Sequence, residues 1–257
     1  FLSNPSEESG YKAVMKATHD LKAAIRYIKM NDELFNEYSI DPNRVIVGGY
    51  SAGAMTSINA AYLNDFDELP SFLLDDYDDT GGLEGLSGNQ GYDSSFDGII
   101  NLSGAVGNVD WIIEQDIPIV SMHGNLDDVV PYGNDLITLF GLNIEVDGSY
   151  VIHQRMLELG NYSELYTYDN QGHNPYSDMI FETEFSSNFI YNIICPQDAL
   201  GDINLDQSIN VLDIILLVNF ILELDFPTSN QLYIADFNQD EMLNILDVIS
   251  ILNQILD

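Results

Sequence analysis

One short stretch, VIVGGYSAGAM at residues 45–55, constrains the fold of this chain more than any other feature of its sequence. It opens with three apolar, β-branched residues, which predict a short buried strand, and two glycines then interrupt that strand. The small residues over 52–62 predict a helix, so Ser51 stands at a strand-to-helix junction within the pattern Gly-x-Ser-x-Gly. In that setting the pattern predicts a strained turn that presents the serine hydroxyl as a nucleophile, with flanking positions that tolerate little more than hydrogen. Whether Ser51 is a nucleophile or only a small residue on a tight turn depends on partners elsewhere in the chain.

The order of the other segments predicts an α/β fold. Apolar residues at helical spacing predict a helix over 10–30, and an Asp-Pro-Asn turn at 41–43 leads into the strand before Ser51. The remaining segments are predicted as strands over 98–104, 117–124 and 163–170, and as helices over 133–141, 149–159 and 176–194. Strands that alternate with helices indicate a doubly wound, mostly parallel sheet with helices on both sides.

The charge of the chain restricts its partners. There are 42 acidic and 7 basic side chains, which give a formal net charge of −35. Such a field repels phosphate backbones and anionic bilayers but suits the binding of cations, so we expect no nucleic-acid partner. The longest apolar runs are short and interrupted by Asp or Asn, so we expect no membrane span. The single cysteine, Cys195, excludes an intrachain disulfide.

An acidic, glycine-rich segment over 65–97 separates the predicted nucleophile helix from the next strand. Two roles stay open for it. It could form a cap that faces the substrate with Phe72, Leu73 and Tyr77, or it could be a mobile excursion of the surface.

A serine hydroxyl needs a base to take its proton, and the base needs an acid to orient it. The segment HGNLDDVVPY follows a predicted buried strand and offers Asp127, with Asp128 as the rival. The segment YDNQGHNPY places His173 in a polar loop directly after another strand. Sites form at such strand ends in open parallel sheets, so His173 is the candidate base.

The other three histidines have positions that predict structural roles. His19 and His153 lie in predicted helices, where we expect surface or packed side chains. His123 directly follows a predicted strand and is expected to support the acid loop rather than to transfer protons.

The stretch HDLKAAIRYIKMNDELFNEYSIDPNRVIVGGYSAGAM, together with the acid and histidine loops, resembles the carboxylesterase and hormone-sensitive-lipase-like branch of the α/β-hydrolase family. The resemblance covers about residues 10–195 and implies Ser51 as nucleophile and His173 as general base and acid. It also implies Asp127 as the orienting acid, because the family spacing H-G-x-x-D-x-x-V-P selects it over its neighbour. The main-chain N–H of Ala52 would be one oxyanion donor. The other oxyanion donors in this family come from a His-Gly-Gly loop upstream of the first helix. The sequence begins at Phe1, without that loop and without a signal-like stretch, so we expect the chain to be N-terminally truncated.

A duplicated unit follows this region. The segments GDINLDQSINVLDIILLVNFIL and ADFNQDEMLNILDVISILNQIL align with each other, and their first aspartates, Asp202 and Asp236, lie 34 residues apart. A repeat of this kind indicates a separate small domain. We therefore predict a catalytic domain over residues 1–195 and a small all-α calcium domain over 196–257.

Each repeat places oxygen ligands at positions 1, 3, 5, 7, 9 and 12 of a loop, with position 7 acting through its main-chain carbonyl. Hard oxygen ligands at this spacing, closed by a carboxylate at position 12, suit Ca²⁺. The predicted ligands are Asp202, Asn204, Asp206, Ser208, Asn210 and Asp213 in the first loop, and Asp236, Asn238, Asp240, Met242, Asn244 and Asp247 in the second.

The repeat pair resembles the type I dockerin module over about residues 199–257. The resemblance implies two structural Ca²⁺ ions and a cohesin domain on a scaffold protein as the partner. Position 6 of each loop, usually Gly, is Gln207 or Glu241, which is expected to weaken calcium binding. As an alternative to a cohesin, the apolar residues after each loop could dock onto the same chain; these residues are Val211, Leu212, Ile245 and Leu246.

Together these patterns predict a secreted or cell-surface bacterial serine esterase that carries a calcium-dependent docking module and needs no cofactor for catalysis. Acetyl or feruloyl esters of polysaccharides are the suggested substrates, by analogy with the module pairing alone. Two alternatives stay open. One is a serine peptidase of the prolyl-oligopeptidase type, and the other is a non-catalytic binding or scaffold subunit with a vestigial triad.

Overall fold

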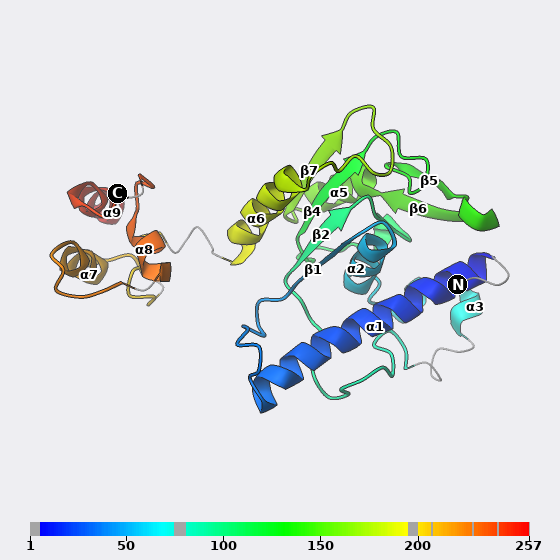
Figure 1. Cartoon of the computed structure of the whole chain (residues 1–257), viewed down its shortest axis with the longest axis horizontal. Coiled ribbons are helices and arrows are strands. Elements are labelled where there is room, and N and C mark those ends of the chain that lie inside the picture. The colour runs from blue at the N-terminus through cyan, green and yellow to red at the C-terminus, as the bar shows by residue number, and fades with distance from the viewer. Residues whose placement is uncertain are drawn as a thin grey trace. The chain divides into compact units, whose positions relative to one another are not determined.

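A computed structural model gives the fold and describes residues 6–74, 81–194, 200–206, 208–227, 229–240 and 242–256. The chain divides into two compact units, Phe1–Ile193 and Ile194–Asp257. Figure 1 shows the elements of both units, and each unit is described by itself below. Cys195, Tyr77, Gln207 and Glu241 lie outside the described residues.

The first unit is built on a four-stranded parallel sheet with the order β1-β2-β4-β7 (Figure 1). Its strands are β1 (Ile46–Tyr50), β2 (Gly98–Leu102), β4 (Ile119–Gly124) and β7 (Ser163–Tyr168). Every pairing in this sheet is parallel. All six residues of β4 are buried, as expected for a strand that is covered on both faces. The predicted parallel sheet is confirmed.

Helices pack on both faces of this sheet. The helices of this unit are α1 (Glu7–Leu34), α2 (Ala52–Tyr62), α3 (Ser71–Leu74), α5 (Ser149–Glu158) and α6 (Ile180–Ile194), and α3 contacts α1. On one face, Ile99 of β2 shares the main hydrophobic core with Ile58 of α2 and Ile152 of α5. On the other face, Gly98 lies against Phe189 and Ile193 of α6, whose side chains a Cβ at that position would meet. The sheet is therefore doubly wound, as predicted.

The predicted helix over 133–141 is wrong. That segment forms strand β5 (Asn134–Ile137) and a 3-10 turn, η3 (Leu139–Gly141). The strand pairs antiparallel with β6 (Ile144–Gly148), which also pairs with β3 (Ala105–Val106), and the three strands form a second sheet. Ile137 and Val146 bury their side chains in a small core of this sheet, and this tertiary pairing overrides the local preference of the segment.

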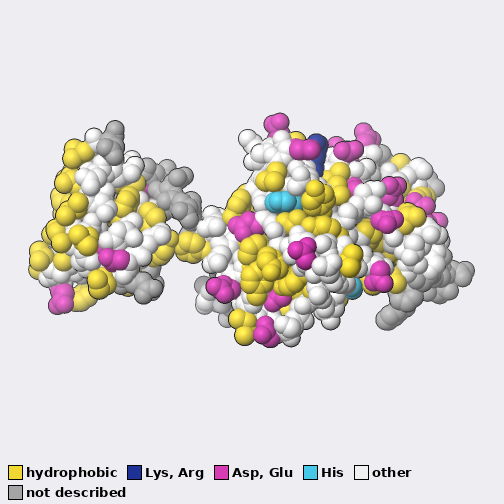
Figure 2. All heavy atoms as spheres, turned by 90° about the horizontal axis from the view of Figure 1, so that it is seen from above, with side chains coloured by type: hydrophobic (Ala, Val, Ile, Leu, Met, Phe, Trp, Pro, Cys, Tyr) yellow, Lys and Arg dark blue, Asp and Glu magenta, His cyan; other side chains and the backbone are white. Residues whose placement is uncertain are grey.

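The acidic segment between α2 and β2 is anchored to α1 where it is described. Lys22 and Arg26 of α1 pair with the two carboxylate oxygens of Glu84 at 2.7 and 3.1 Å, and both cations are almost fully buried. Leu73 belongs to the main core, and the Phe72 ring packs edge-on against Tyr11 of α1. Phe72 and Leu73 thus pack against the rest of the first unit, and the described part of the segment is tied to α1. On the face that Figure 2 shows, acidic side chains are scattered and basic ones are few.

The second unit is all-α, as predicted. It contains α7 (Val211–Ile221), α8 (Ser229–Ala235) and α9 (Ile245–Leu256). Its core is formed by apolar residues from the first repeat, α7, α8 and α9, which are Ile203, Leu217, Phe220, Ile234, Ala235 and Ile251. Each of the two predicted calcium loops leads directly into a helix of this core, α7 or α9.

Candidate active site

The turn after β1 holds Ser51 in a strained conformation. Its backbone has φ 54° and ψ −118°, and the residue directly precedes the first residue of α2. Its N–H donates to the carbonyl of Leu102 at 2.8 Å, which ties the turn to the end of β2. A Cβ on Gly49 would lie 2.5 Å from the Gly53 carbonyl carbon, whereas a Cβ on Gly53 would meet nothing within 4 Å. The expected crowding therefore exists at the first glycine of the pattern and not at the second.

The structure brings Ser51, His173 and Asp127 together. His173 lies in the loop after β7, and its Nε2 is 2.8 Å from the Ser51 hydroxyl oxygen. Its Nδ1 is 2.7 Å from Oδ2 of Asp127, which lies in the loop after β4. The rival acid, Asp128, is exposed to solvent. A hydroxyl bonded to an imidazole that is bonded to a carboxylate has the geometry required to remove the hydroxyl proton.

Asp127 is held in its ionised form. Its side chain is fully buried, and this burial raises its pKa. Hydrogen bonds from His123, His173 and the N–H groups of Val129 and Val130 outweigh the burial, so the pKa of the carboxyl lies below its usual value. The two amides donate to Oδ1 at 2.8 and 3.0 Å. A negative charge is thus fixed behind the imidazole, where it stabilises the imidazolium that forms when His173 takes a proton.

His123 supports the acid from inside the sheet. The residue is fully buried, and its Nε2 lies 2.9 Å from Oδ2 of Asp127 and 3.1 Å from the carbonyl oxygen of Val130. Because both neighbours are acceptors, we assign the proton to Nε2. Nδ1 then accepts from the Ser149 hydroxyl at 2.7 Å. This geometry agrees with the predicted supporting role.

The remaining histidines are packed elsewhere in the first unit. His19 Nε2 lies 2.8 Å from the carbonyl oxygen of Gly82, and His153 Nδ1 lies 2.8 Å from the Ser163 hydroxyl. Burial lowers the pKa of both histidines. Neither of these contacts involves Ser51.

Ala52, the expected oxyanion donor, is the first residue of α2. The N–H groups in the first turn of a helix have no partner within the helix, and the helix dipole places partial positive charge at that end. The N–H of Ala52 follows Ser51 directly, so it is available to a negative charge that develops on a carbonyl bound at the serine.

Two residues around His173 were not predicted from the sequence. The Tyr50 hydroxyl donates to the main-chain carbonyl of His173 at 3.2 Å, and the Ser103 hydroxyl donates to the same carbonyl at 3.1 Å. The signal for Ser103 was its place directly after a buried strand. Tyr50 occupies the first x position of the Gly-x-Ser-x-Gly pattern. Any residue is allowed at that position, so the pattern gave no signal for Tyr50.

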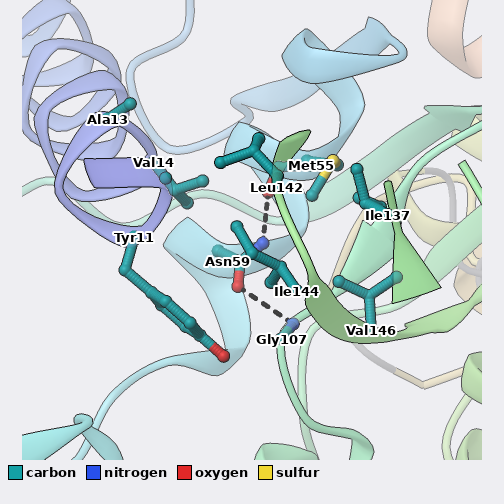
Figure 3. Close-up of a pocket in the computed structure, with 11 residues that line it drawn as sticks. Tyr11, Ala13, Val14, Met55, Asn59, Gly107, Ile137, Leu142, Ile144 and Val146 are labelled. Carbon is teal, nitrogen blue, oxygen red and sulfur yellow. Dashed lines mark hydrogen bonds between the residues drawn. The ribbon is translucent and has the colours of Figure 1, made fainter. Parts of the chain in front are cut away.

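An apolar cavity of about 190 Å³ lies between α1, α2 and the small sheet (Figure 3). Met55, one turn of α2 after Ser51, contributes to its lining together with Val14, Leu142 and Ile144. Asn59, which also lines it, already donates to the Met55 carbonyl at 2.7 Å and accepts from the Gly107 N–H at 3.3 Å. The cavity thus suits an uncharged, apolar group.

A more polar cavity of about 470 Å³ shares Tyr11 and Gly107 with the apolar one. Its lining includes four carboxylates, those of Glu7, Glu68, Glu145 and Asp147. Burial, followed by the charges of Glu7 and Glu145, raises the pKa of Tyr11. This cavity disfavours anionic ligands.

The two predicted calcium loops repeat the same hydrogen bonds. In the first loop, the buried carboxylate of Asp213 accepts from the N–H groups of Asn204 and Asn210 at 3.0 and 2.8 Å. In the second loop, buried Asp247 accepts from the N–H groups of Asn238 and Asn244 at 3.2 and 2.9 Å. The aspartate at position 12 therefore closes both loops in the same way.

The donor set of each loop fits a hard cation. Each loop has carboxylates at positions 1, 5 and 12 and amide oxygens at positions 3 and 9. Within the described ranges, no three His, Cys, Asp or Glu side chains alone form a group that could hold a metal ion. Amide and main-chain oxygens would therefore have to complete the coordination, as Ca²⁺ permits.

This geometry defines a class: an α/β-hydrolase fold with a serine, histidine and aspartate at the ends of its strands, followed by a small helical module. Comparisons with known proteins agree. Residues 200–256 match the family model described as the dockerin type I domain, and residues 8–82 match the family model BD-FAE. No curated protein sequence matches the chain.

Two solved structures with a similar fold are described as esterases. A truncated form of a carbohydrate esterase from gut microbiota is 20% identical, with a TM-score of 0.50, and the match covers 68% of this chain and 67% of that one. Esterase 2 of Thermogutta terrifontis, phosphoramylated by tabun, is 15% identical, with a TM-score of 0.50, and the match covers 71% of this chain and 66% of that one. The chain thus spans about two thirds of the length of these proteins and shares their fold.

Proposed function

We propose that the first unit is a serine carboxylic-ester hydrolase. The observation that carries the proposal is the chain of hydrogen bonds from the Ser51 hydroxyl through both nitrogens of His173 to Asp127, at 2.8 and 2.7 Å. Esterases share the fold and support the reaction class. The fold alone would not decide it, because hydrolases of several kinds use the same triad.

In the first half-reaction, Ser51 Oγ attacks the carbonyl carbon of the ester while Nε2 of His173 takes the hydroxyl proton. The negative charge that forms on the carbonyl oxygen accepts a hydrogen bond from the Ala52 N–H. His173 then gives its proton to the leaving alcohol, and the acyl group stays on Ser51. In the second half-reaction, His173 takes a proton from water, the hydroxide attacks the acyl carbon, and the proton returns to Ser51 as the acid leaves.

For the substrate, we propose acyl groups esterified to polysaccharides, such as acetyl or feruloyl. The support is the pairing with a dockerin-like module and the likeness to a structure described as a carbohydrate esterase. The acidic surface adds a physical argument, because a formal net charge of −35 favours a neutral polymer over an anionic one.

For the second unit, we propose calcium binding in both loops and docking to a cohesin domain outside the bacterial cell. The carboxylate and amide oxygens of each loop would hold the ion, with the carbonyls of Ser208 and Met242 at position 7. A bound Ca²⁺ would neutralise the clustered carboxylates and fix the loop that leads into the following helix. Among the residues that the structure describes, no helix is long and apolar enough to cross a bilayer.

The decisive experiment compares the wild-type chain with Ser51→Ala in the hydrolysis of p-nitrophenyl acetate and in labelling by a fluorophosphonate. We expect turnover and stoichiometric labelling in the wild type and neither in the variant. Circular dichroism of both proteins serves as the folding control. A folded wild type that neither turns over nor is labelled would refute the esterase and leave a non-catalytic subunit.

A further inference from the structure

The histidine of the site lies on a loop that has no helix or strand of its own. Strand β7 ends at Tyr168 and α6 begins at Ile180, so His173 depends on contacts for its position. The first part of this loop is tied to the acid loop, because Asn170 N–H donates to the Asn125 side chain and Leu126 N–H donates to the Gln171 carbonyl. These contacts fix the approach to the histidine from one side.

A second set of contacts holds the histidine itself. Its main-chain carbonyl accepts hydrogen bonds from the hydroxyls of Ser103 and Tyr50, at 3.1 and 3.2 Å. Tyr50 is the last residue of β1, and Ser103 directly follows β2. The Tyr50 ring also packs against the imidazole, with 5.1 Å between ring centroids. Groups at the ends of two strands thus converge on one residue.

Ser103 makes this contact from an unusual backbone conformation. Its φ is 54°, and the residue is fully buried. Left-handed backbone is unfavourable for a residue with a side chain and persists where the surroundings enforce it, often at functional sites. The N–H of Ser103 donates to the Met122 carbonyl at 3.0 Å, so the strand end itself is anchored.

Tyr176, three residues after the histidine, completes the arrangement. Its hydroxyl lies 2.7 Å from the Met122 carbonyl oxygen and 2.7 Å from the Ser103 hydroxyl oxygen, and its one proton is shared between these two acceptors because the Ser103 proton goes to the His173 carbonyl. Its ring stands edge-on to Tyr50, with 5.7 Å between centroids. The Ser103 hydroxyl is therefore held between the tyrosine and the carbonyl of His173.

We propose that Ser103, assisted by the Tyr50 hydroxyl, is a positioning residue for His173. The inference rests on the proposed function of the site. The imidazole must keep both its 2.8 Å contact with Ser51 and its 2.7 Å contact with Asp127. Without the carbonyl contacts, the loop keeps its ties to the acid loop and the bond of Tyr176 to Met122, but His173 itself loses its hydrogen bonds to the ends of β1 and β2. A shift of about 1 Å in such a group lowers the rate about 100-fold.

The test uses Ser103→Ala, Ser103→Gly and Tyr50→Phe in the whole chain, with Tyr62→Phe as the control. Tyr62 is fully buried and donates to the Ile117 carbonyl, so its variant loses an equivalent bond within the core. We expect both Ser103 variants to lose about 10- to 100-fold in kcat and in the rate of fluorophosphonate labelling, with KM within about twofold. Tyr50→Phe should lose less, and Tyr62→Phe should keep kcat.

The glycine variant separates positioning from backbone strain. Glycine accepts a positive φ without cost but lacks the hydroxyl. If Ser103 serves only the turn, Ser103→Gly will keep the wild-type kcat, and the proposal is wrong. If the hydroxyl positions the histidine, Ser103→Gly and Ser103→Ala will be equally impaired.

A measurement that does not depend on catalytic activity tests the positioning role separately from the proposed esterase function. The Nδ1 proton of His173, bonded to Asp127, should give a low-field proton NMR signal that disappears in His173→Gln. In the Ser103 variants we expect that signal to broaden or to move upfield. If the wild type shows no turnover and no labelling, the esterase proposal fails, and this signal alone decides the positioning role. An unchanged signal in both Ser103 variants overturns it.

Discussion

Replacing Asp127 by Asn tests the proposed triad most sharply, because the change keeps the shape of the side chain and removes only its charge and one acceptor. In the wild type, Oδ1 accepts from the N–H groups of Val129 and Val130, and Oδ2 accepts from His173 and His123. The amide oxygen of Asn can serve the two main-chain groups. The amide nitrogen, which is itself a donor, then faces the N–H groups of His173 and His123. It can accept a hydrogen bond from neither of them.

The histidine of the triad can escape this conflict only by changing its tautomer. With Nδ1 as an acceptor of the Asn amide, the proton of His173 moves to Nε2. That nitrogen then donates to Ser51 and can no longer take its proton, so we expect kcat to fall on the order of 10⁴-fold. His123 keeps its Nε2 contact with the Val130 carbonyl at 3.1 Å. The free energy of unfolding should therefore fall by only about 1–3 kcal/mol, the cost of one poorly satisfied buried donor.

The assay is p-nitrophenyl acetate hydrolysis at saturating substrate, with urea unfolding of the same proteins. Asp128→Asn is the matched control, since Asp128 is the exposed neighbour in sequence. We expect that control to keep kcat within about twofold, as for surface changes away from a site. An Asp127→Asn variant that keeps more than a tenth of the wild-type kcat would refute the triad assignment. Equal losses in both variants would show that the loop, not the carboxylate, is required.

Three further outcomes are expected. Gly49→Ala should destabilise the fold and abolish labelling of the serine, because its Cβ would lie 2.5 Å from the backbone of Gly53, whereas Gly53→Ala, which meets nothing within 4 Å, should be tolerated in thermal melting and labelling. Asp213→Ala and Asp247→Ala should each remove part of the calcium-dependent rise in the melting temperature of the second unit, and a rise that survives the double substitution would contradict the loop assignment. The pKa of Asp127 is lowered in the folded state, so its stabilising contribution is present above the unfolded-state value of about 3.9 and is lost as the pH falls further. The difference in urea stability between wild type and Asp127→Asn should accordingly shrink below about pH 4, and a constant difference would contradict that assignment.

The sequence predicted the features that depend on local pattern. A buried strand, a glycine-rich turn and a helix around Ser51 are specified by neighbouring residues, so both the turn and its place in a parallel sheet could be predicted. The duplicated helical module could be predicted for the same reason. The grouping of Asp127 with His173 needed more, because they are far apart in the chain. Parallel strands, whose carboxyl ends meet at one edge of the sheet, predicted that the two loops lie together. The resemblance to the hydrolase family then selected Asp127 over Asp128.

The features that the sequence did not predict depend on tertiary contact. The segment at Asn134–Ile137 became a strand because β6 lies beside it, and nothing within the segment reports that neighbour. The crowding around Gly49 but not Gly53 depends on the path of the following helix. The hydroxyls of Tyr50 and Ser103 contact a residue more than 60 positions away in the chain. The place of Ser103 after a buried strand was a local signal, but no local pattern could reveal which residue either hydroxyl contacts.

The strand order also explains why a residue after β2 should matter to a site formed by β1, β4 and β7. Asp127 and His173 follow the neighbouring strands β4 and β7, and their loops are tied together by direct hydrogen bonds between residues 125 and 170 and between residues 126 and 171. The acid and the base are therefore expected to move as one body. Ser51 follows β1, which is separated from β4 by β2. Ser103, at the end of that intervening strand, lies where a hydroxyl can couple the histidine loop to the part of the sheet that carries the serine.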